Sequence, residues 1–360
     1  MDDIRLGVIG YGFRGAGLLG MARSVERLQP TAVCDETQAA RDQAKADFPE
    51  VALFDDPLSM ITSGSIDAVM VETPPMSHAD QAIAALENNI HVLSDVPAIH
   101  SLDEVGPLWE AAEKSTTIYM FGATANYFGF VQTCSDLIAK GLLGKPFYLE
   151  AEYIHDLREF SKTTPWRIGY EPIRYCTHSL GPLLEWLGKE LVTVSCFGSG
   201  SHIDKDAGDD AMLAMFRTES GELVKLMVSF SNSNSFGRHH YLCHATHGTF
   251  ECTWPLTGEE PKVSFSSNNI YGFEKTINLV VSSGRPEHAT MENLSGHGSL
   301  DYATLVDFVK AIDGEPCSLG LQQAFRMTLP GLYALESAVN GGRVTKIKYP
   351  WSRNGPDCFS

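Results

Sequence analysis

Short apolar runs and amphipathic stretches alternate through the N-terminal part of the chain. The stretches 77–88 and 102–114 repeat their apolar positions at helical spacing. This alternation of strands and helices predicts a doubly wound α/β domain, a parallel sheet with helices on both faces. The predicted strands are Ile4–Ile9, Pro30–Cys34, Val51–Phe54, Ala68–Glu72, His91–Leu93 and Thr117–Gly122.

The pattern changes after Gly122. A helix at 128–140 leads into a strand at 147–155, and strand-like runs then dominate until helices return at 300–312 and 322–340, before a last strand at 344–347. We expect an α+β domain with an open, mainly antiparallel sheet, and loops at 231–236 and 287–298. Its other predicted strands are Leu191–Phe197, Ala211–Arg217, Leu223–Phe230, Tyr241–Thr246, Gly248–Cys252 and Lys262–Ser266.

The two patterns divide the chain into two predicted domains, 1–122 and 123–360. A length of 360 residues suits two domains. Whether the last helix packs back on the first domain stays open.

Composition narrows the class of protein. A formal charge of −18 argues against nucleic acid and anionic membrane surfaces as partners. The N-terminus shows no leader pattern, and no apolar run is long enough to span a membrane. The eight cysteines form no Cys-x-x-Cys pair, and the twelve histidines show no metal spacing, so His239, His240, His244 and His247 are interpreted as strand residues. We expect reduced thiols, a cytoplasmic protein and no metal.

A glycine-rich turn follows the first strand. Gly10, Gly12 and Gly15 stand in Gly-x-Gly-x-x-Gly between that strand and a helix-like segment at 16–24. In this setting the first glycine permits a tight turn, the second lets a pyrophosphate approach, and the third lets helix and strand pack closely. The helix N-terminus offers N–H groups to the phosphates. The alternative is an ordinary glycine-rich turn.

Asp35 ends the second predicted strand, where a carboxylate usually holds a ribose 2′-hydroxyl. It would repel a 2′-phosphate, and neither Glu36 nor Thr37 supplies a cation. The sequence therefore favours NAD over NADP. The alternative interpretation of Asp35 is an N-cap for the helix at 38–46.

Taken together, these motifs resemble the Gfo/Idh/MocA family of sugar and polyol oxidoreductases. The resemblance rests on the glycine turn, Thr73-Pro74-Pro75-x-x-His78, His91-Val92-Leu93 before Pro97, and the antiparallel C-terminal domain. It implies that the second domain, 123–360, binds the substrate and makes oligomer contacts, and that the protein is a homo-oligomer, a dimer or tetramer. The cofactor-binding residues that we expect are Gly10, Gly12, Phe13, Arg14, Gly15, Asp35, Thr73, Pro74, His78, Asp95, Pro97 and Asn126.

Two departures from the family pattern bear on the chemistry. The usual Glu-Lys-Pro stands here as Asp95-Val96-Pro97, and valine cannot replace the lysine. The segment 174–181 keeps only His178 of the family's acid-x-x-x-His-x-x-acid pattern.

These changes are similar to a branch that includes NAD-dependent glycosidases such as bacterial α-N-acetylgalactosaminidases. The motifs that carry this likeness are Glu152-Tyr153-Ile154-His155, Trp166-Arg167, Tyr175-x-Thr177-His178-x-x-Gly181-Pro182, Gly296-His297-Gly298-x-x-Asp301 and Asn126-Tyr127.

Proton transfer needs a base, and His178 is the first candidate because imidazole titrates near neutrality. Its alternative is a core histidine bonded to a carbonyl. Tyr175 and Tyr127 are further candidates if a cation, Arg167 or Arg174, lowers the phenol pKa. Their alternative is ordinary packing.

The resemblance also suggests groups that contact a carbohydrate. His155, Arg167 and His297 are expected to bind the substrate, and Trp166 either stacks on a sugar face or packs in the core. Asp156 and Asp301 are interpreted as capping or orienting residues.

Three functions follow from these residues. The first is an NAD-dependent dehydrogenase acting on a ring hydroxyl, at carbon 3. The second is a redox-neutral glycosidase that oxidises carbon 3 transiently, eliminates the aglycone and needs no carboxylate pair across the bond. The third is a non-catalytic NAD-binding sensor.

Overall fold

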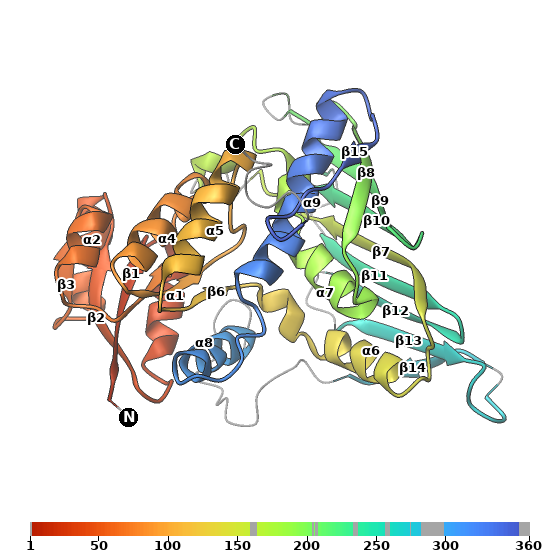
Figure 1. Cartoon of the computed structure of the whole chain (residues 1–360), viewed down its shortest axis with the longest axis horizontal. Coiled ribbons are helices and arrows are strands. Elements are labelled where there is room, and N and C mark those ends of the chain that lie inside the picture. The colour runs from red at the N-terminus through yellow and green to blue at the C-terminus, as the bar shows by residue number, and fades with distance from the viewer. Residues whose placement is uncertain are drawn as a thin grey trace. The chain divides into compact units, whose positions relative to one another are not determined.

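The computed structural model describes residues 2–158, 164–203, 205, 208–232, 237–255, 260–273, 275–281 and 299–352. It contains two compact units (Figure 1). Unit 1 comprises 1–124, 285–325 and 350–360, and unit 2 comprises 125–284 and 326–349. The first segment ends near the predicted boundary at 122, but two later segments also belong to unit 1. No described helix is long and apolar enough to cross a membrane.

Unit 1 contains a six-stranded parallel sheet in the order β3-β2-β1-β4-β5-β6, which confirms the predicted doubly wound fold. The order reverses beside β1, and ligands of such sheets bind at the carboxyl ends of the strands near this switch. The strands are β1 (Ile4–Ile9), β2 (Leu28–Cys34), β3 (Ala52–Phe54), β4 (Ala68–Val71), β5 (His91–Ser94) and β6 (Tyr119–Phe121). The helices are α1 (Phe13–Ala22), α2 (Gln38–Asp47), α3 (Pro57–Thr62), α4 (His78–Glu87), α5 (Val105–Lys114) and α8 (Ser299–Ile312).

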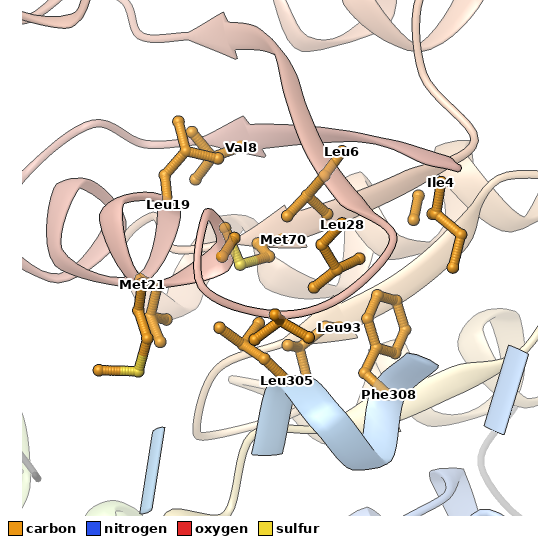
Figure 2. Close-up of a cluster of buried hydrophobic side chains, with 14 of the residues drawn as sticks. Ile4, Leu6, Val8, Leu19, Met21, Leu28, Met70, Leu93, Leu305 and Phe308 are labelled. Carbon is orange, nitrogen blue, oxygen red and sulfur yellow. The ribbon is translucent and has the colours of Figure 1, made fainter. Parts of the chain in front are cut away.

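The core of unit 1 includes a helix from far along the chain. Leu6 and Val8 of β1 and Leu28 of β2 are buried together with Leu305 and Phe308 of α8, as Figure 2 shows. Burying an aliphatic or aromatic side chain contributes roughly 1.5–3 kcal/mol. The apolar face of α8 therefore accounts for its place in unit 1.

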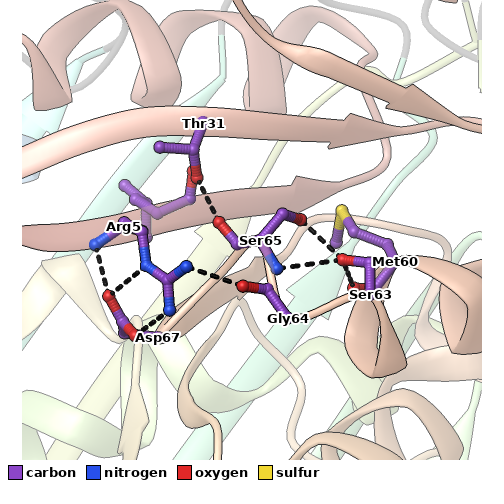
Figure 3. A network of polar contacts seen from close by, with 8 residues as sticks. Arg5, Thr31, Met60, Ser63, Gly64, Ser65 and Asp67 are labelled. Atoms are coloured by element: carbon purple, nitrogen blue, oxygen red, sulfur yellow. Dashed lines mark hydrogen bonds and ion pairs between the residues drawn. The ribbon is translucent and has the colours of Figure 1, made fainter.

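A polar network joins the amino ends of β1 and β4 (Figure 3). Arg5 Nε and Nη2 donate to the two carboxylate oxygens of Asp67 at 3.0 and 2.7 Å, and Nη1 donates to Gly64 O at 2.6 Å. Thr31 Oγ1 donates to Ser65 O at 3.0 Å. This edge lies at the opposite ends of the strands from the glycine turn, so we interpret the network as structural.

Unit 2 contains a nine-stranded, mainly antiparallel sheet in the order β14-β13-β12-β11-β7-β10-β9-β8-β15, as predicted. The exception is the parallel pair of β7 and β10. The strands are β7 (Pro146–Ile154), β8 (Leu191–Gly198), β9 (Ala211–Thr218), β10 (Leu223–Ser229), β11 (Arg238–Ala245), β12 (Gly248–Pro255), β13 (Lys262–Ser267), β14 (Ile277–Leu279) and β15 (Thr345–Lys346).

The two faces of this sheet differ. Helices α6 (Gly129–Ala139) and α7 (Thr177–Leu187) lie on one face, and α9 (Leu321–Val339) continues into unit 2 from Arg326 (Figure 1). Along β9, Met212 and Phe216 are buried, whereas the alternate residues Leu213 and Met215 are 44% and 39% exposed. The other face is therefore open and partly apolar, which confirms the predicted open sheet.

Candidate functional site

The glycine turn between β1 and α1 is shaped by two of its three glycines. Gly10 has a φ of +93°, and a Cβ on it would lie 2.8 Å from the carbonyl oxygen of Glu72. A Cβ on Gly15 would lie 1.9 Å from the carbonyl oxygen of Gly10. At Gly12, the N-cap of α1, a Cβ would meet nothing within 4 Å. Of these three glycines, only Gly12 has open space beside its Cα. The turn therefore fits a pyrophosphate that is held at the N-terminus of α1.

The Asp35 carboxylate connects the turn after β1 with the turn after β2. Its Oδ2 accepts from Tyr11 N at 2.8 Å, and its Oδ1 accepts from Thr37 N at 2.9 Å and Thr37 Oγ1 at 2.8 Å. The N-cap of α2 is Thr37, so the alternative capping role of Asp35 is wrong. Arg41 Nη1 donates to the carbonyl oxygens of Asp35 and Glu36 at 2.7 and 3.0 Å, a cation beside this position that the sequence analysis missed.

Arg14 is surrounded by three carboxylates within unit 1. Its Nη1 donates to Asp301 Oδ2 at 2.7 Å, and its Nε lies 3.3 Å from Asp95 Oδ2 and 3.8 Å from Glu72 Oε2. Burial raises the pKa of Glu72 well above its ordinary value, and Asp95 adds to the rise while Arg14 opposes it. The Arg14 guanidinium is thus bound to carboxylates of the chain itself, and its role toward a cofactor stays a prediction. Asp301 accepts from Arg14 at the glycine turn, and its expected capping or orienting role stays a prediction.

The predicted cofactor residues after β4 and β5 are held together by His78. Its ring is buried, with Nδ1 at 2.8 Å from Pro97 O and Nε2 at 2.7 Å from Thr73 O. Thr73 Oγ1 donates to Gln81 Oε1 at 2.7 Å. The His78 side chain thus fixes the two turns at the carboxyl ends of adjacent strands. Phe13, the first residue of α1, is 91% exposed.

Unit 2 brings the predicted base His178 beside Tyr175. His178 Nε2 lies 3.1 Å from the Tyr175 hydroxyl oxygen, which is hydrogen-bond distance. Tyr241 on β11 donates its hydroxyl proton to the carbonyl oxygen of His178 at 3.0 Å and so fixes the start of α7. The Nε2 atom of His178 therefore contacts a phenol, and its role as a base stays a prediction.

A pair of imidazoles also contacts Tyr153. His155 Nε2 and His239 Nε2 are 2.8 Å apart. The Tyr153 ring stacks on His155 at 4.2 Å, on His239 at 4.8 Å and on His178 at 5.8 Å between centroids. We call these five residues, Tyr153, His155, Tyr175, His178 and His239, the imidazole–tyrosine cluster.

Electrostatics keep several of these groups neutral. Burial lowers the pKa of His155 to about 4, and the charge of Arg167 adds to the effect. Burial also raises the pKa of Tyr153. At neutral pH both side chains are therefore uncharged, and each can donate or accept hydrogen bonds to a polar ligand.

The predicted substrate residues Trp166 and Arg167 lie beside the cluster. The guanidinium carbon of Arg167 is 4.3 Å from the Trp166 ring centroid and 5.4 Å from that of Tyr175. Arg174 instead pairs with Glu171, at 3.1 Å from Nε to Oε2. Of the two cations considered for Tyr175, Arg167 is therefore the one whose guanidinium lies over the Tyr175 ring.

Asn126 and Tyr127 belong to the short helix η3 (Thr124–Tyr127). Asn126 is buried, and its Nδ2 donates to Glu185 Oε2 at 3.2 Å. Its Oδ1 has no hydrogen-bond partner among the described residues. Tyr127 is half-buried. Their roles toward cofactor and substrate stay predictions, and His297 lies outside the described residues.

His239 is a site residue that the sequence pattern did not predict. It lies on a strand, as expected, but the strand pairing decides what its side chain touches: His239 lies opposite Tyr153 in the β11–β7 register. The available signal was period-two alternation, because His239 shares one face of β11 with the buried Tyr241 and Cys243.

Comparison with known proteins agrees with this architecture. Residues 4–123 match a family model described as oxidoreductase family, NAD-binding Rossmann fold, and residues 131–251 match the GFO/IDH/MocA C-terminal domain. The protein is thus of the oxidoreductase class with an NAD-binding Rossmann domain. Since the two matches together span two thirds of the chain, it belongs to the Gfo/Idh/MocA family.

Among curated relatives, the glycosyl hydrolase family 109 protein of Saccharopolyspora erythraea is 29% identical over 69% of this chain, and the match spans 63% of that protein. The one from Solibacter usitatus is 26% identical over 96% of this chain and 87% of its own length. Glycosyl hydrolase family 109 protein 1 of Bacteroides fragilis is 25% identical over 84% and 75%. The predicted likeness to a glycosidase branch is confirmed.

Two solved structures show the same fold. Levoglucosan dehydrogenase in complex with NADH and L-sorbose has a TM-score of 0.82 at 19% identity, over 97% of this chain and 100% of that one. Scyllo-inositol dehydrogenase from Lactobacillus casei with NAD(H) and scyllo-inositol has a TM-score of 0.75 at 16% identity, over 96% and 99%.

Proposed function

We propose that this protein is an NAD-dependent enzyme that acts on a sugar or glycoside at a ring hydroxyl, at carbon 3. The observation that carries the proposal is the hydrogen-bond contact between His178 and Tyr175 beside Arg167. A phenol and an imidazole in contact form a proton-transfer pair, and the Arg167 guanidinium lies over the phenol ring. NAD, when bound, would accept a hydride from the ring carbon.

The proton transfer can be written for this pair. The substrate hydroxyl gives its proton to the Tyr175 oxygen, and Tyr175 gives its own proton to His178 Nε2, so the charge comes to rest on the imidazole. Trp166 and His155 support a sugar ligand, since one offers an aromatic face and the other a neutral polar ring. Asp35, the glycine turn and the turns joined by His78 would hold the cofactor.

The names of the curated relatives favour a second outcome, redox-neutral glycoside cleavage. In that reaction the oxidised carbon 3 acidifies the proton on carbon 2, a base removes it, and the aglycone leaves before water adds and the hydride returns. Each step needs proton transfer but no carboxylate pair across the scissile bond.

One experiment separates these outcomes. The protein is incubated with NAD and a panel of aryl glycosides of both anomers, and NADH absorbance is read together with released aglycone. NADH without aglycone indicates a dehydrogenase, and aglycone without net NADH indicates a glycosidase. If neither signal rises above that of a boiled control, the enzyme proposal is wrong and a non-catalytic NAD-binding sensor is favoured.

We also propose a homo-oligomer, a dimer or tetramer, formed through the open face of the unit 2 sheet. Phe197, Leu213 and Met215 are 59%, 44% and 39% exposed on the neighbouring strands β8 and β9. Such a patch favours a protein interface. Sedimentation should show an oligomer at micromolar concentration, and the double change Leu213→Glu and Met215→Glu should dissociate it while Leu58→Glu on α3 of unit 1, where Leu58 is also exposed, leaves it intact.

A cytoplasmic location completes the proposal. The seven described cysteines are all free thiols, and six of them are buried. Reduced buried thiols suit a reducing compartment. Fractionation of the native cell should place the protein with cytoplasmic markers, and recovery with secreted or envelope proteins would refute this location.

A further inference from the structure

The His155–His239 contact has no part in the proton transfer proposed for Tyr175 and His178. His155 stands just after β7 and His239 on β11, the strand paired with β7. Their Nε2 atoms are 2.8 Å apart, and both rings stack on Tyr153. A separation of 2.8 Å is hydrogen-bond distance, so one of the two rings donates an N–H proton to the other.

When both rings are neutral, the hydrogen bond between His155 and His239 allows two arrangements of their N–H protons. Because His155 is neutral above its lowered pKa of about 4, its ring carries one N–H. If His239 donates from Nε2, the proton of His155 is on Nδ1; if His155 donates from Nε2, its Nδ1 is bare. Nδ1 of His155 has no hydrogen-bond partner among the described residues. The partner ring therefore decides whether this outer nitrogen donates or accepts.

We propose that His239 is a positioning residue that sets the tautomer of His155 and thereby fixes Nδ1 of His155 as the polar contact for a sugar hydroxyl. The inference rests on the proposed function, because it takes a sugar as the ligand of the cluster. When a hydroxyl proton moves to Nδ1, the Nε2 proton of His155 moves to Nε2 of His239, and the reverse shift returns it. In the forward shift the His155–His239 pair gains one proton, and the sugar hydroxyl loses one.

The surroundings favour a relay over a permanent charge on His155. Arg167 opposes a positive charge there, and the facing Tyr153 is a buried neutral phenol. Trp254 on β12 meets His239 edge-on at 5.8 Å, and Tyr175 and His178 complete the titratable groups of the cluster. Asp156, next to His155 in the chain, pairs with Arg158.

The test compares His239→Phe, His239→Gln and the control His240→Gln in the full chain. Phenylalanine keeps the ring for stacking but removes the hydrogen bond, whereas glutamine keeps a donor and an acceptor. His240 lies on the same strand with its side chain on the opposite face, bonded to Glu251 Oε1 at 3.0 Å.

The first readout is the ¹⁵N chemical shifts of the His155 ring, assigned with His155→Gln and measured without sugar. Wild-type and His240→Gln should show one dominant tautomer, and His239→Phe should show averaged shifts of two tautomers. Unchanged His155 shifts in His239→Phe would overturn the inference. This readout holds even if no sugar is turned over, which would count against the proposed function alone.

The second readout is turnover. His239→Phe should lower kcat about tenfold to a hundredfold, the usual effect of losing the outer partner of a functional imidazole, with KM within about threefold of wild type. His239→Gln should recover part of that loss and His240→Gln should lose nothing. Equal losses for Phe and Gln, together with lowered Tm, would show a merely structural role and refute the assignment.

Discussion

Units 1 and 2 hold their candidate site residues in different ways. In unit 1 two of the site side chains bind backbone groups of neighbouring turns: Asp35 accepts from two backbone N–H groups, and His78 contacts two carbonyl oxygens, whereas Arg14 pairs with carboxylates. In unit 2 the side chains bind one another, His178 with Tyr175 and His155 with His239. A site built on turns is tied to local sequence spacing, whereas a site built from side-chain pairs depends on how distant strands align.

The largest expected effect tests the side-chain pairs. His178→Ala removes the proton acceptor of Tyr175, so we expect turnover to fall roughly 10²–10⁴-fold, the usual contribution of a general acid or base. NAD affinity, measured by fluorescence titration, should stay within about twofold because the glycine turn is in unit 1. Turnover close to that of wild type would remove His178 from the mechanism.

Two glycine changes test the turn-built site. Gly15→Ala would place its Cβ 1.9 Å from a carbonyl oxygen, so it should cost about 1–3 kcal/mol of unfolding free energy or more. Gly12→Ala meets nothing in the chain, so its Tm should match wild type while NAD affinity drops at least about tenfold. Thermal melts with and without NAD measure both. Full NAD affinity in Gly12→Ala would contradict a pyrophosphate at this turn.

Asp35→Ala sharpens the assignment of NAD. Losing the carboxylate should weaken NAD binding by about tenfold, since a charged hydrogen bond contributes on the order of 1.5–3 kcal/mol. The affinity for NADP should rise relative to the affinity for NAD, because the Arg41 guanidinium stays beside the position that the Asp35 carboxylate occupied. Calorimetric titration with both cofactors decides this, and tighter binding of NADP than NAD to the unchanged protein would refute the preference. In the double variant Asp35→Ala, Arg41→Gln the relative gain should disappear.

The smallest expected effect is the loss of stability when the Arg5–Asp67 pair at the amino ends of β1 and β4 is broken. The Arg5 hydrogen bond lowers the pKa of Asp67, so this contribution to stability is complete above the ordinary carboxyl pKa and is lost as the pH falls through the lowered value. Both side chains are more than a third exposed, so Arg5→Gln should cost less than ~1 kcal/mol at pH 7. Urea unfolding at pH 7 and at pH 3 should show this difference shrinking in acid. If wild type and Arg5→Gln differ more in unfolding free energy at pH 3 than at pH 7, the predicted direction of this pH dependence is wrong.

Local patterns predicted unit 1 well. The glycine spacing and Asp35 need only the β1–α1 turn and the end of β2, which lie within a short stretch of chain. The candidate site residues of unit 2 were harder to predict from the sequence. His178, Tyr175, His155 and Trp166 could be selected through family likeness, but His239 depended on the β11–β7 register, which no local pattern specifies. Arg41 was missed because a guanidinium on α2 reaches back over a helical turn to Asp35.

Helix α8 has a consequence for how the chain is made. Leu305 and Phe308 complete a core whose other members come from the first strands, and Asp301 binds Arg14 of the glycine turn. During synthesis the chain emerges from its N-terminus, and domains usually fold as units as they appear. Here the cofactor domain cannot close its core until α8 has left the ribosome. A fragment ending at residue 124 would therefore expose the apolar surface that α8 covers, and the nascent domain is a natural client for chaperones.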